Sequence, residues 1–415
     1  MLFLYTIATR FYFLGIRVAS IFNVKAAVII KGHKNWRQKL AEQIEPNSEY
    51  IWMHCASLGE FEQGRPLIEK FKSDPLTKNY KIILSFFSSS GYEVRKNYQF
   101  ADIVCYLPFD TKKNARDFVK ILKPNFAVFV KYEFWHYYLD ELHSQKIPAY
   151  CISAIFREKQ MFFKPYGKFF LKTLHTFKHI FVQDENSKRL LTDKNITNVD
   201  VCGDTRMDRV IQIASEKYEN IFLDEFSSEK HTIVCGSTWP EDEEILSQFI
   251  NASDEKFRFI IAPHEVNNKH IRGLLQLINK SVILYSDITN QAPNDYSVVI
   301  IDTIGLLSKL YRFGEIAFIG GGFGKGIHNV LEAAVYDIAV VFGPNYKKFK
   351  EAEDLVEIGA GFSIKTLHDL TNIINNIINN KLFTSDTQNK AKAYISHSSG
   401  STQHIFTKLH LIGEF

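Results

Sequence analysis

The sequence lacks the features by which several classes of protein are recognised. Its 415 residues include only five cysteines, with no Cys-x-x-Cys pair and no Cys-His cluster. This spacing argues against a disulfide framework and against a zinc site, and it predicts a reducing, cytoplasmic compartment. An Asp-x-Asp pair at the end of an apolar run is also missing, so we expect neither a metal ion nor a cofactor.

A long apolar run without charges is missing as well. Residues 1–22 are rich in Leu, Phe, Ile and Tyr, but Arg10 and Arg17 interrupt them and no small-residue cleavage site is obvious. A secretory signal is therefore not expected. The arginines are seven residues apart and share one helical face, so residues 1–22 are predicted to form a membrane-associated helix whose arginines reach the headgroups. The alternatives are a true span and a helix packed on its own domain.

The net charge is small, at +4, but the sum hides an uneven distribution. Residues 1–210 hold 32 Lys and Arg against 21 Asp and Glu, a net of +11, which leaves −7 for residues 211–415. This asymmetry predicts two domains with different partners. The basic residues that follow the first apolar segment suit an anionic membrane surface: Lys25, Lys31, Lys34, Arg37 and Lys39.

Short apolar runs alternate with amphipathic segments over the rest of the chain, and many of the runs are apolar on both faces, as in a parallel sheet covered by helices. The first series of predicted strands is Tyr50–His54, Lys81–Phe86, Asp102–Leu107, Phe126–Val130, Ala149–Ser153 and His179–Val182, with helices such as Phe61–Phe71 and Lys112–Leu122 between them. The second series is His231–Cys235, Phe257–Ala262, Ser281–Leu284, Ser297–Ile301, Glu315–Gly320 and Ile338–Phe342. The sequence thus predicts an α/β protein with two Rossmann-like domains, 23–210 and 231–415, joined by a linker at 211–230. The last helix is allowed to cross back to the N-terminal domain.

Two glutamates follow apolar strands of the first series. After Trp52–Cys55 a Ser57-Leu58-Gly59 loop turns and Glu60 opens a helix, while Phe129-Val130 leads to Glu133. Because ligands bind beyond the carboxyl ends of parallel strands, the two carboxylates are predicted to converge on a substrate hydroxyl. The alternatives are a helix-start residue favoured by the macrodipole and a solvated surface residue.

A third motif, Phe318–Ala334, leads from a strand into a loop with five glycines. We expect a helix to begin near His328-Asn329, so that backbone N–H groups and a helix N-terminus bind an anion. The loop lacks the Lys-Ser/Thr of a Walker motif. Five glycines beside a strand end are hard to explain by packing, although a flexible loop with an exposed Glu332 is the alternative.

The segment Ile155–His179 mixes basic and aromatic residues. It holds six basic residues and one acidic residue, with seven phenylalanine or tyrosine residues among them. Such a mixture binds single-stranded nucleic acid or a phosphorylated lipid at a membrane surface. We favour the lipid and expect no nucleic acid, because the basic N-terminal segment belongs to the same domain. A core-facing aromatic stripe with a solvated basic face is the alternative.

In this order, the motifs resemble those of one family, the 3-deoxy-D-manno-octulosonic acid (Kdo) transferases. The most specific parts are Ser57-Leu58-Gly59-Glu60, Lys131-Tyr132-Glu133-Phe134-Trp135, and His328-Asn329-Val330-Leu331-Glu332-Ala333-Ala334 followed by Val341–Tyr346. The resemblance implies a GT-B glycosyltransferase, with two Rossmann-like domains facing a cleft. It also implies transfer of Kdo from CMP-Kdo to a lipid A precursor, at the cytoplasmic face of the inner membrane.

The resemblance also implies roles for residues. Glu60 is similar to the family's catalytic base, Glu133 to its second essential carboxylate, and Arg206 stands where the family usually has Lys. The donor CMP-Kdo is expected at Pro263, His264, Ile304, Gly305, Leu306, Gly322, Lys325, Asn329, Val330, Leu331 and Glu332. Acceptor or membrane contacts are expected at Ser57, Gly59, Arg157, Lys164 and Lys168. Two other functions stay open: another GT-B enzyme acting on a membrane lipid, and a non-catalytic protein that binds anionic lipid.

Overall fold

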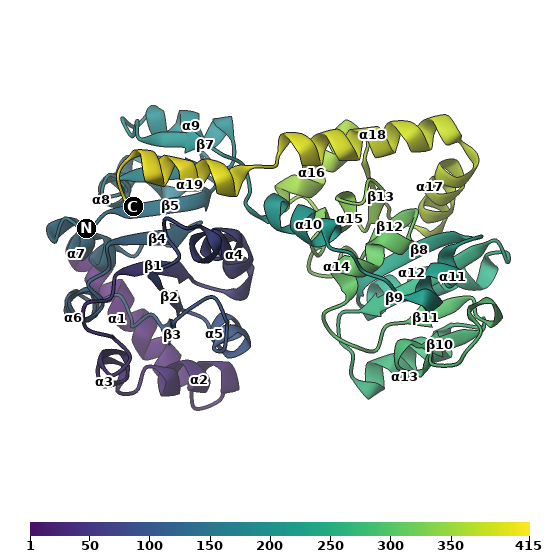
Figure 1. The fold of residues 1–415 in the computed structure, drawn as a ribbon, viewed down its shortest axis with the longest axis horizontal. Helices are drawn as coiled ribbons and strands as arrows, with labels where there is room; N and C mark the ends of the chain where they lie inside the picture. The colour runs from purple at the N-terminus through teal and green to yellow at the C-terminus, as the bar shows by residue number, and fades with distance from the viewer. The chain divides into compact units, whose positions relative to one another are not determined.

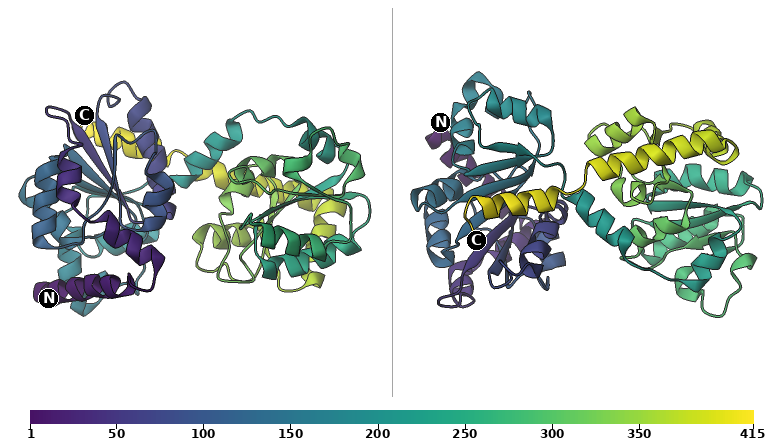
Figure 2. Two further views of the ribbon diagram at one scale, coloured as in Figure 1. Left: turned by 90° about the horizontal axis from the view of Figure 1, so that it is seen from below. Right: turned by 45° about the horizontal axis from the view of Figure 1, so that its top comes forward.

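The computed structural model describes residues 1–415, which form two compact units (Figure 1). The first unit comprises Met1–Asp208 and Ser399–Phe415, and the second comprises Arg209–Ser398. The last helix, α19 (Ser401–Leu411), therefore belongs to the first unit, where it packs on α4 (Leu58–Ser73) (Figure 2). Each unit is built on one sheet of seven strands.

The first sheet is entirely parallel and has the strand order β3-β2-β1-β4-β5-β6-β7. Its strands are β1 Tyr50–Cys55, β2 Lys81–Phe86, β3 Ile103–Tyr106, β4 Phe126–Val130, β5 Ala149–Ala154, β6 His179–Val182 and β7 Val199–Val201. The chain winds from β1 outward to β3 and then returns to the other side of β1, which is the Rossmann topology.

Helices cover both faces of this sheet, so it has two hydrophobic cores. Successive side chains of a strand point to opposite faces, and in β1 Trp52 enters one core while Met53 enters the other. The remaining helices of the unit are α1 Leu2–Ala19, α2 Val24–Gly32, α3 Trp36–Ala41, α5 Ser89–Arg95, α6 Lys112–Leu122, α7 His136–Ser144, α8 Lys168–Leu174 and α9 Glu185–Thr192. Side-chain caps such as Thr111 on α6 and Asp184 on α9 fix where helices begin.

Helix α1 packs on the first unit without burying any of its residues. It is the one helix of the chain that is long and apolar enough to cross a membrane. The Tyr5 hydroxyl donates a hydrogen bond to Asp110, and the Tyr5 ring contacts Phe169 and Phe170 of α8. Leucine and phenylalanine side chains on its other side are exposed. Helix α1 thus has polar and aromatic contacts on its inner face and an apolar outer face.

The second sheet is also parallel, in the order β10-β11-β9-β8-β12-β13-β14. Its strands are β8 His231–Thr238, β9 Phe257–Pro263, β10 Val282–Leu284, β11 Val298–Ile300, β12 Ile316–Ile319, β13 Ala339–Phe342 and β14 Gly361–Ser363. Helix α10 (Arg206–Ser215) joins the units, and the other helices are α11 Ile221–Ser227, α12 Pro240–Ala252, α13 Asn268–Leu277, α14 Leu307–Leu310, α15 Leu331–Ala334, α16 Lys350–Ile358, α17 Leu367–Asn379 and α18 Lys381–His397.

The α/β class and the two parallel sheets predicted from the sequence are confirmed. All twelve predicted strands are present, and two more, β7 and β14, were missed. Both missed strands have three residues and lie at a sheet edge, where so short an apolar pattern is not distinct from a loop. The predicted helix start at His328-Asn329 is wrong, because α15 begins at Leu331 and has only four residues.

Candidate functional site

Each sheet has one topological switch point, where the chain winds outward on both sides of a central strand. In the first sheet this strand is β1, between β2 and β4, and in the second it is β8, between β9 and β12. Open α/β sheets bind their ligands beyond the carboxyl ends of the strands at such points. The Glu60 and Glu133 loops follow β1 and β4, and the glycine-rich loop follows β12, so both predicted sites have this location.

Glu60 lies in the first turn of α4 and forms a capping box with Ser57. The backbone N–H of Ser57 donates to the Glu60 carboxylate at 3.1 Å, and the Ser57 side chain accepts from the N–H of residue 60. The sequence SLGE therefore fixes where the carboxyl group points. Gly59 is exposed, and a side chain there would meet no atom closer than 4.0 Å.

The environment raises the pKa of Glu60 to about 7. Burial is the largest cause and the negative charge of Glu133 is the second, while hydrogen bonds from the backbone of Ala56 and Ser57 act in the opposite direction. From sequence, a helix N-terminus alone would lower this pKa, and Glu60 would need shielding to act as a base. Burial and the negative charge of Glu133 raise the pKa and so outweigh the effect of the helix N-terminus.

Glu133 is buried and has polar partners on two sides. One carboxylate oxygen, Oε2, accepts a hydrogen bond from Trp135 Nε1 at 2.6 Å and lies 3.2 Å from His54 Nε2. His54 Nδ1 lies 2.9 Å from the hydroxyl of Ser85, which also accepts from Trp52 Nε1 at 2.7 Å. Two neighbouring strands, β1 and β2, and the loop after β4 thus hold the Glu133 carboxyl group in one position.

The predicted cation Arg206 opens α10. Its guanidinium group pairs with Asp204 at 2.6 Å, and Asp204 also accepts from Gln63 Nε2 at 3.1 Å. Burial alone would raise the pKa of Asp204, but Arg206 and Gln63 lower it below its usual value. Arg206 is therefore oriented by the largely buried carboxylate of Asp204, in the first unit.

The basic aromatic segment divides its side chains between the core and solvent. Three of its phenylalanines pack around Phe134, which stacks on Phe156 at 5.8 Å, meets Phe162 edge to face at 5.3 Å and contacts Phe177. Phe169 and Phe170 contact Tyr5 instead. Arg157 and Lys168 are exposed, and Lys164 is half-buried. The three predicted cations belong to the loop after β5 and the start of α8, on the segment that contacts α1.

The glycine-rich loop of the second unit is held by the buried carboxylate of Asp242 in α12. This group accepts hydrogen bonds from the backbone N–H groups of Gly321 at 2.7 Å, Trp239 at 2.9 Å and Phe323 at 3.4 Å. The N–H groups of Gly322 and Lys325 have no acceptor within the protein. Lys325 is exposed, so its N–H group is open to an anionic ligand, whereas Gly322 is buried.

Packing explains several of the glycines, contrary to the expectation from sequence. A side chain on Gly320 would lie 2.2 Å from the Ser237 carbonyl oxygen, and one on Gly322 would lie 2.5 Å from the Gly343 nitrogen. The loop therefore needs glycine to pass close to β8 and β13, whether or not it binds a ligand. Helix α15 starts late because the Asn329 side chain accepts from the Leu331 N–H at 3.1 Å, which forms an Asx-turn before the helix.

Three rings stack where the loops after β8, β9 and β12 meet. His264 lies 4.4 Å from Trp239 and 4.4 Å from His328, between ring centroids. Trp239 Nε1 also donates to His328 Nε2 at 3.0 Å. Burial, followed by the charge of His264, lowers the pKa of His328 to about 4, so His328 is neutral at pH 7.

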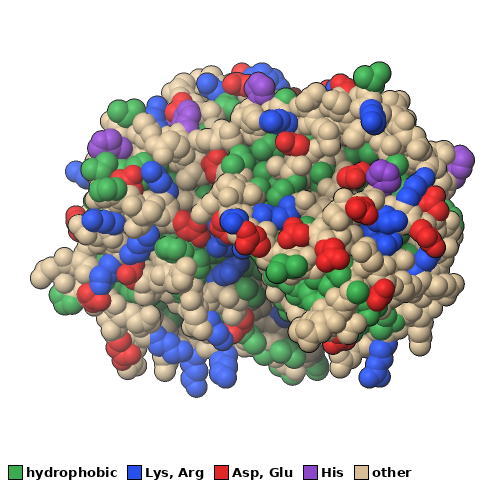
Figure 3. Space-filling model, turned by 45° about the vertical axis from the view of Figure 1, so that its right-hand side comes forward, with side chains coloured by type: hydrophobic (Ala, Val, Ile, Leu, Met, Phe, Trp, Pro, Cys, Tyr) green, Lys and Arg blue, Asp and Glu red, His purple; other side chains and the backbone are tan.

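The other residues that the sequence predicts to bind the donor CMP-Kdo differ in which of their groups a ligand could contact. Pro263 ends β9 beside the stacked rings, and the stretch Ile304–Leu306 follows β11, with Ile304 86% exposed and Gly305 at a φ of 94°. The side chains of Val330 and Leu331 are fully buried, so only their backbone can contact a ligand. Asn329 donates to Glu332 at 3.0 Å. Acidic and basic side chains are interspersed on the face that Figure 3 shows.

Sequence reasoning missed several residues of these two sites. In the first unit they are His54, Ser85, Trp135 and Asp204, and in the second they are Trp239, Asp242 and the stacked position of His328. The signal available was position: Trp239 and Asp242 follow β8, and Trp135 follows β4, at the edges where ligands bind. A side chain's partner on another strand is not readable from one sequence.

Comparison with known proteins identifies relatives of both the sequence and the fold. Residues 34–209 match the family described as 3-deoxy-D-manno-octulosonic-acid transferase (kdotransferase). A bifunctional glycosyltransferase/methyltransferase of Fusobacterium nucleatum is 26% identical over 81% of the chain, which spans 53% of that longer protein. A 3-deoxy-D-manno-octulosonic acid transferase of Rickettsia typhi is 25% identical over 92% of the chain and 84% of its own length.

Solved structures resemble the chain at the level of the fold. UDP-GlcNAc 2-epimerase from Neisseria meningitidis has a TM-score of 0.62 at 16% identity, over 87% of this chain and 99% of its own. MurG of Acinetobacter baumannii has a TM-score of 0.56 at 12% identity, over 87% and 99%. With its two Rossmann-like sheets, the chain has the GT-B fold.

Proposed function

We propose that the chain belongs to the family of Kdo transferases, whose model matches residues 34–209, and that it is a glycosyltransferase. In this proposal it transfers Kdo from CMP-Kdo to a hydroxyl group of a lipid A precursor. The transfer inverts the configuration of the Kdo anomeric carbon, and Glu60 is the general base. The observation that carries this proposal is the carboxylate pair beyond β1 and β4, in which burial and Glu133 raise the pKa of Glu60 to about 7. A base with a pKa near the working pH is both largely deprotonated and strong enough to accept a hydroxyl proton.

In the proposed step, the Glu60 carboxylate takes the proton of the acceptor hydroxyl as that oxygen bonds to the anomeric carbon of Kdo. The bond from this carbon to the phosphate oxygen breaks, and its electron pair leaves with CMP. The free N–H groups of Gly322 and Lys325, the Lys325 side chain and Arg206 supply donors and positive charge for the leaving phosphate. Glu60 then releases its proton to water, which restores the base.

The location of the reaction is proposed from the first unit. Its apolar helix α1, the net charge of +11 over residues 1–210 and the cations Arg157, Lys164 and Lys168 suit the cytoplasmic face of an inner membrane with anionic lipids. If the first unit lies on this membrane face, a lipid acceptor embedded in the membrane is close to it. The partners proposed are CMP-Kdo, a lipid A precursor and the membrane surface.

The test is transfer by the purified protein from CMP-Kdo to a tetra-acylated lipid A precursor, with products weighed by mass spectrometry. We expect the acceptor to gain the mass of Kdo, in reactions without added metal and with EDTA present. A parallel reaction with UDP-N-acetylglucosamine is expected to give no product. Transfer from the UDP-sugar but not from CMP-Kdo would favour another GT-B enzyme and would refute the proposal.

The rate of transfer is expected to depend on pH through Glu60. Below pH 7 the base is increasingly protonated, so kcat/KM should fall about tenfold for each pH unit and should level off above pH 7 to 8. His328 stays neutral over this range because its pKa is about 4. The substitution Glu133→Gln removes the neighbouring charge that raises the pKa, so the midpoint measured with that variant should move to lower pH. An unchanged midpoint would contradict the coupling of the two groups.

A further inference from the structure

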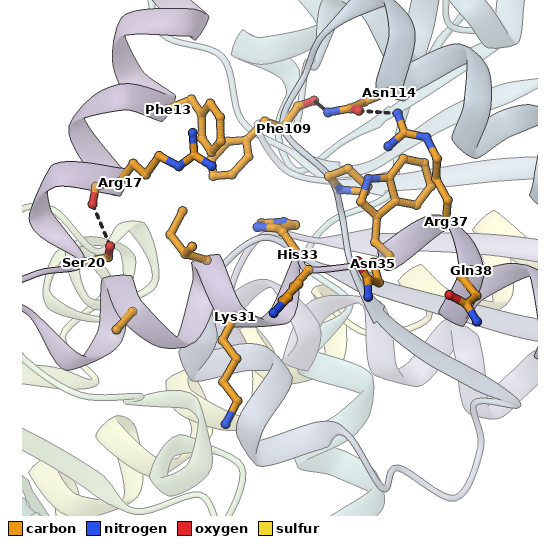
Figure 4. Close-up of a pocket in the computed structure, with 15 residues that line it drawn as sticks. Phe13, Arg17, Ser20, Lys31, His33, Asn35, Arg37, Gln38, Phe109 and Asn114 are labelled. Atoms are coloured by element: carbon orange, nitrogen blue, oxygen red, sulfur yellow. Dashed lines mark hydrogen bonds between the residues drawn. The ribbon is translucent and has the colours of Figure 1, made fainter.

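An open pocket of about 860 Å³ lies in the first unit between α1, α2, α3 and the loop before α6 (Figure 4). It does not include the Glu60 and Glu133 site, and none of its lining residues was assigned to acceptor or donor. Four of the residues that line it are Arg or Lys, and none is Asp or Glu: Arg17, Lys31, Lys34 and Arg37. A concave surface whose charged residues are all cations favours an anionic ligand.

Three of the four cations have no ion-pair partner within the protein. Arg37 pairs with Asp117 at 2.8 Å and donates to Asn114 at 2.9 Å, whereas Arg17, Lys31 and Lys34 have no carboxylate within reach. Arg17 lies over the ring of Phe13, with 5.5 Å from its guanidinium carbon to the ring centroid. Figure 4 shows it reaching from α1 over the pocket, across from Arg37. The pocket thus carries uncompensated positive charge.

The remaining lining of the pocket is apolar and aromatic. Phe13 packs on Phe109 with 4.3 Å between ring centroids, and Trp36 and Ile30 line the floor with them. His33 adds no fixed charge, because burial lowers its pKa. A ligand that fits has an anionic group for the cations and an apolar part for these side chains.

The pocket opens beside the exposed apolar face of α1. Exposed side chains at positions 4, 11, 14 and 18, followed by Ile21 and Phe22 in the next turn, recur at intervals of three, four and seven and so lie along one side of the helix. Phe22 is 86% exposed. Soluble proteins rarely expose such a continuous apolar strip, which suits acyl chains. Arg17 connects the two surfaces, because it is a residue of α1 and its side chain lines the pocket.

We propose that this pocket binds the headgroup phosphate of an anionic membrane glycerophospholipid, with the acyl chains along the exposed face of α1. The inference rests on the membrane association in the proposed function and gives it a defined site. Lys31, Lys34 and Arg17 contact the phosphate, and Trp36 and Phe109 contact the glycerol and the first methylene groups. One lipid held here sets the depth and rotation of the first unit on the membrane.

The test compares two double variants with the same loss of charge. Lys31→Gln/Lys34→Gln removes two pocket cations, while Lys25→Gln/Lys39→Gln removes two exposed lysines of α2 and α3 that do not line the pocket. Binding of the full chain to vesicles of phosphatidylcholine with one third phosphatidylglycerol is measured by co-sedimentation. We expect the pocket variant to bind about 30-fold more weakly and the control variant no more than about 5-fold more weakly. Equal losses would show general surface electrostatics and would overturn the proposal.

Two further readouts identify the ligand. Anionic lipid with brominated acyl chains should quench the fluorescence of Trp36, which lines the pocket, and this quenching should be lost in Trp36→Phe. Soluble dioctanoyl phosphatidylglycerol should raise the melting temperature of the wild type but not of Lys31→Gln/Lys34→Gln. Inorganic phosphate and dioctanoyl phosphatidylcholine should not. An equal shift with inorganic phosphate would make the pocket a site for free phosphate and would refute the lipid assignment.

None of these measurements contains CMP-Kdo or an acceptor. If both variants lost vesicle binding equally and Kdo transfer were normal, only the proposed lipid site in the pocket would be refuted. If lipid binding depended on the pocket but the protein transferred no Kdo, only the proposed function would be refuted.

Discussion

Replacing Glu60 by glutamine is expected to lower kcat for Kdo transfer by about 10²–10⁴-fold, the contribution typical of a positioned general base. Glutamine keeps the size of the side chain and an oxygen that can accept the Ser57 N–H, so α4 retains its first turn. It cannot accept the acceptor's proton. The measurement is single-turnover transfer with saturating CMP-Kdo and acceptor.

Glu62→Gln is the matched control for this variant. Glu62 is on the same helix, two residues on, and pairs with Arg95 at 2.8 Å instead of contributing to the carboxylate pair. We expect its rate to stay within about twofold of the wild type, since this half-buried ion pair is not part of the carboxylate pair. CMP binding by Glu60→Gln, measured by titration calorimetry, should be unchanged. If Glu60→Gln turned over at the wild-type rate, the assignment of Glu60 as the general base would be refuted.

Replacing Asp242 by alanine is expected to weaken CMP binding by about 10–100-fold and to lower the free energy of unfolding by about 3 kcal/mol. The substitution leaves the N–H groups of Gly321, Trp239 and Phe323 without their acceptor. The glycine-rich loop then loses the shape that leaves the Gly322 and Lys325 N–H groups available. Calorimetric titration with CMP and urea unfolding measure the two effects.

Two other variants decide what Asp242 does. Glu244→Ala, an exposed position on the same helix, should change neither quantity. Asp242→Asn keeps one acceptor oxygen and should recover part of the CMP affinity. If Asp242→Ala lost stability but bound CMP as tightly as the wild type, Asp242 would support the fold alone and would have no role in positioning the loop.

The strands were predictable because burial on both faces of a parallel sheet leaves a strong local pattern. The runs Phe126–Val130 and His179–Val182 are bounded in the structure as the sequence predicts. β7 and β14 were not predictable, because three edge residues gain their pairing only from a neighbouring strand. The start of α15 was misplaced for a local reason: the Asn329 side chain accepts from the Leu331 N–H, and the turn that this bond forms precedes the helix.

The candidate site was predictable only in part. Strand-end position located Glu60 and Glu133, and the order of motifs indicated a resemblance to one family. The pKa of Glu60 was not predictable, since it depends on burial and on a carboxylate from another strand. The reason for the glycines of the loop was not predictable either, because it lies in tertiary packing. Their sequence is typical of anion binding, but Gly320 and Gly322 are required by backbone that passes within contact distance.

The sequence by itself determined the fold class, the two series of strands, the resemblance to one family and the apolar N-terminal helix, because each of these follows from local patterns of side chains along one chain. The tertiary structure decided which groups act on one another. It brought His54, Ser85 and Trp135 to Glu133, Asp242 to the glycine-rich loop, and the cations of α1 and α2 to one pocket. Distance in space sets burial, hydrogen bonding and electrostatic interaction, and the sequence does not state those distances.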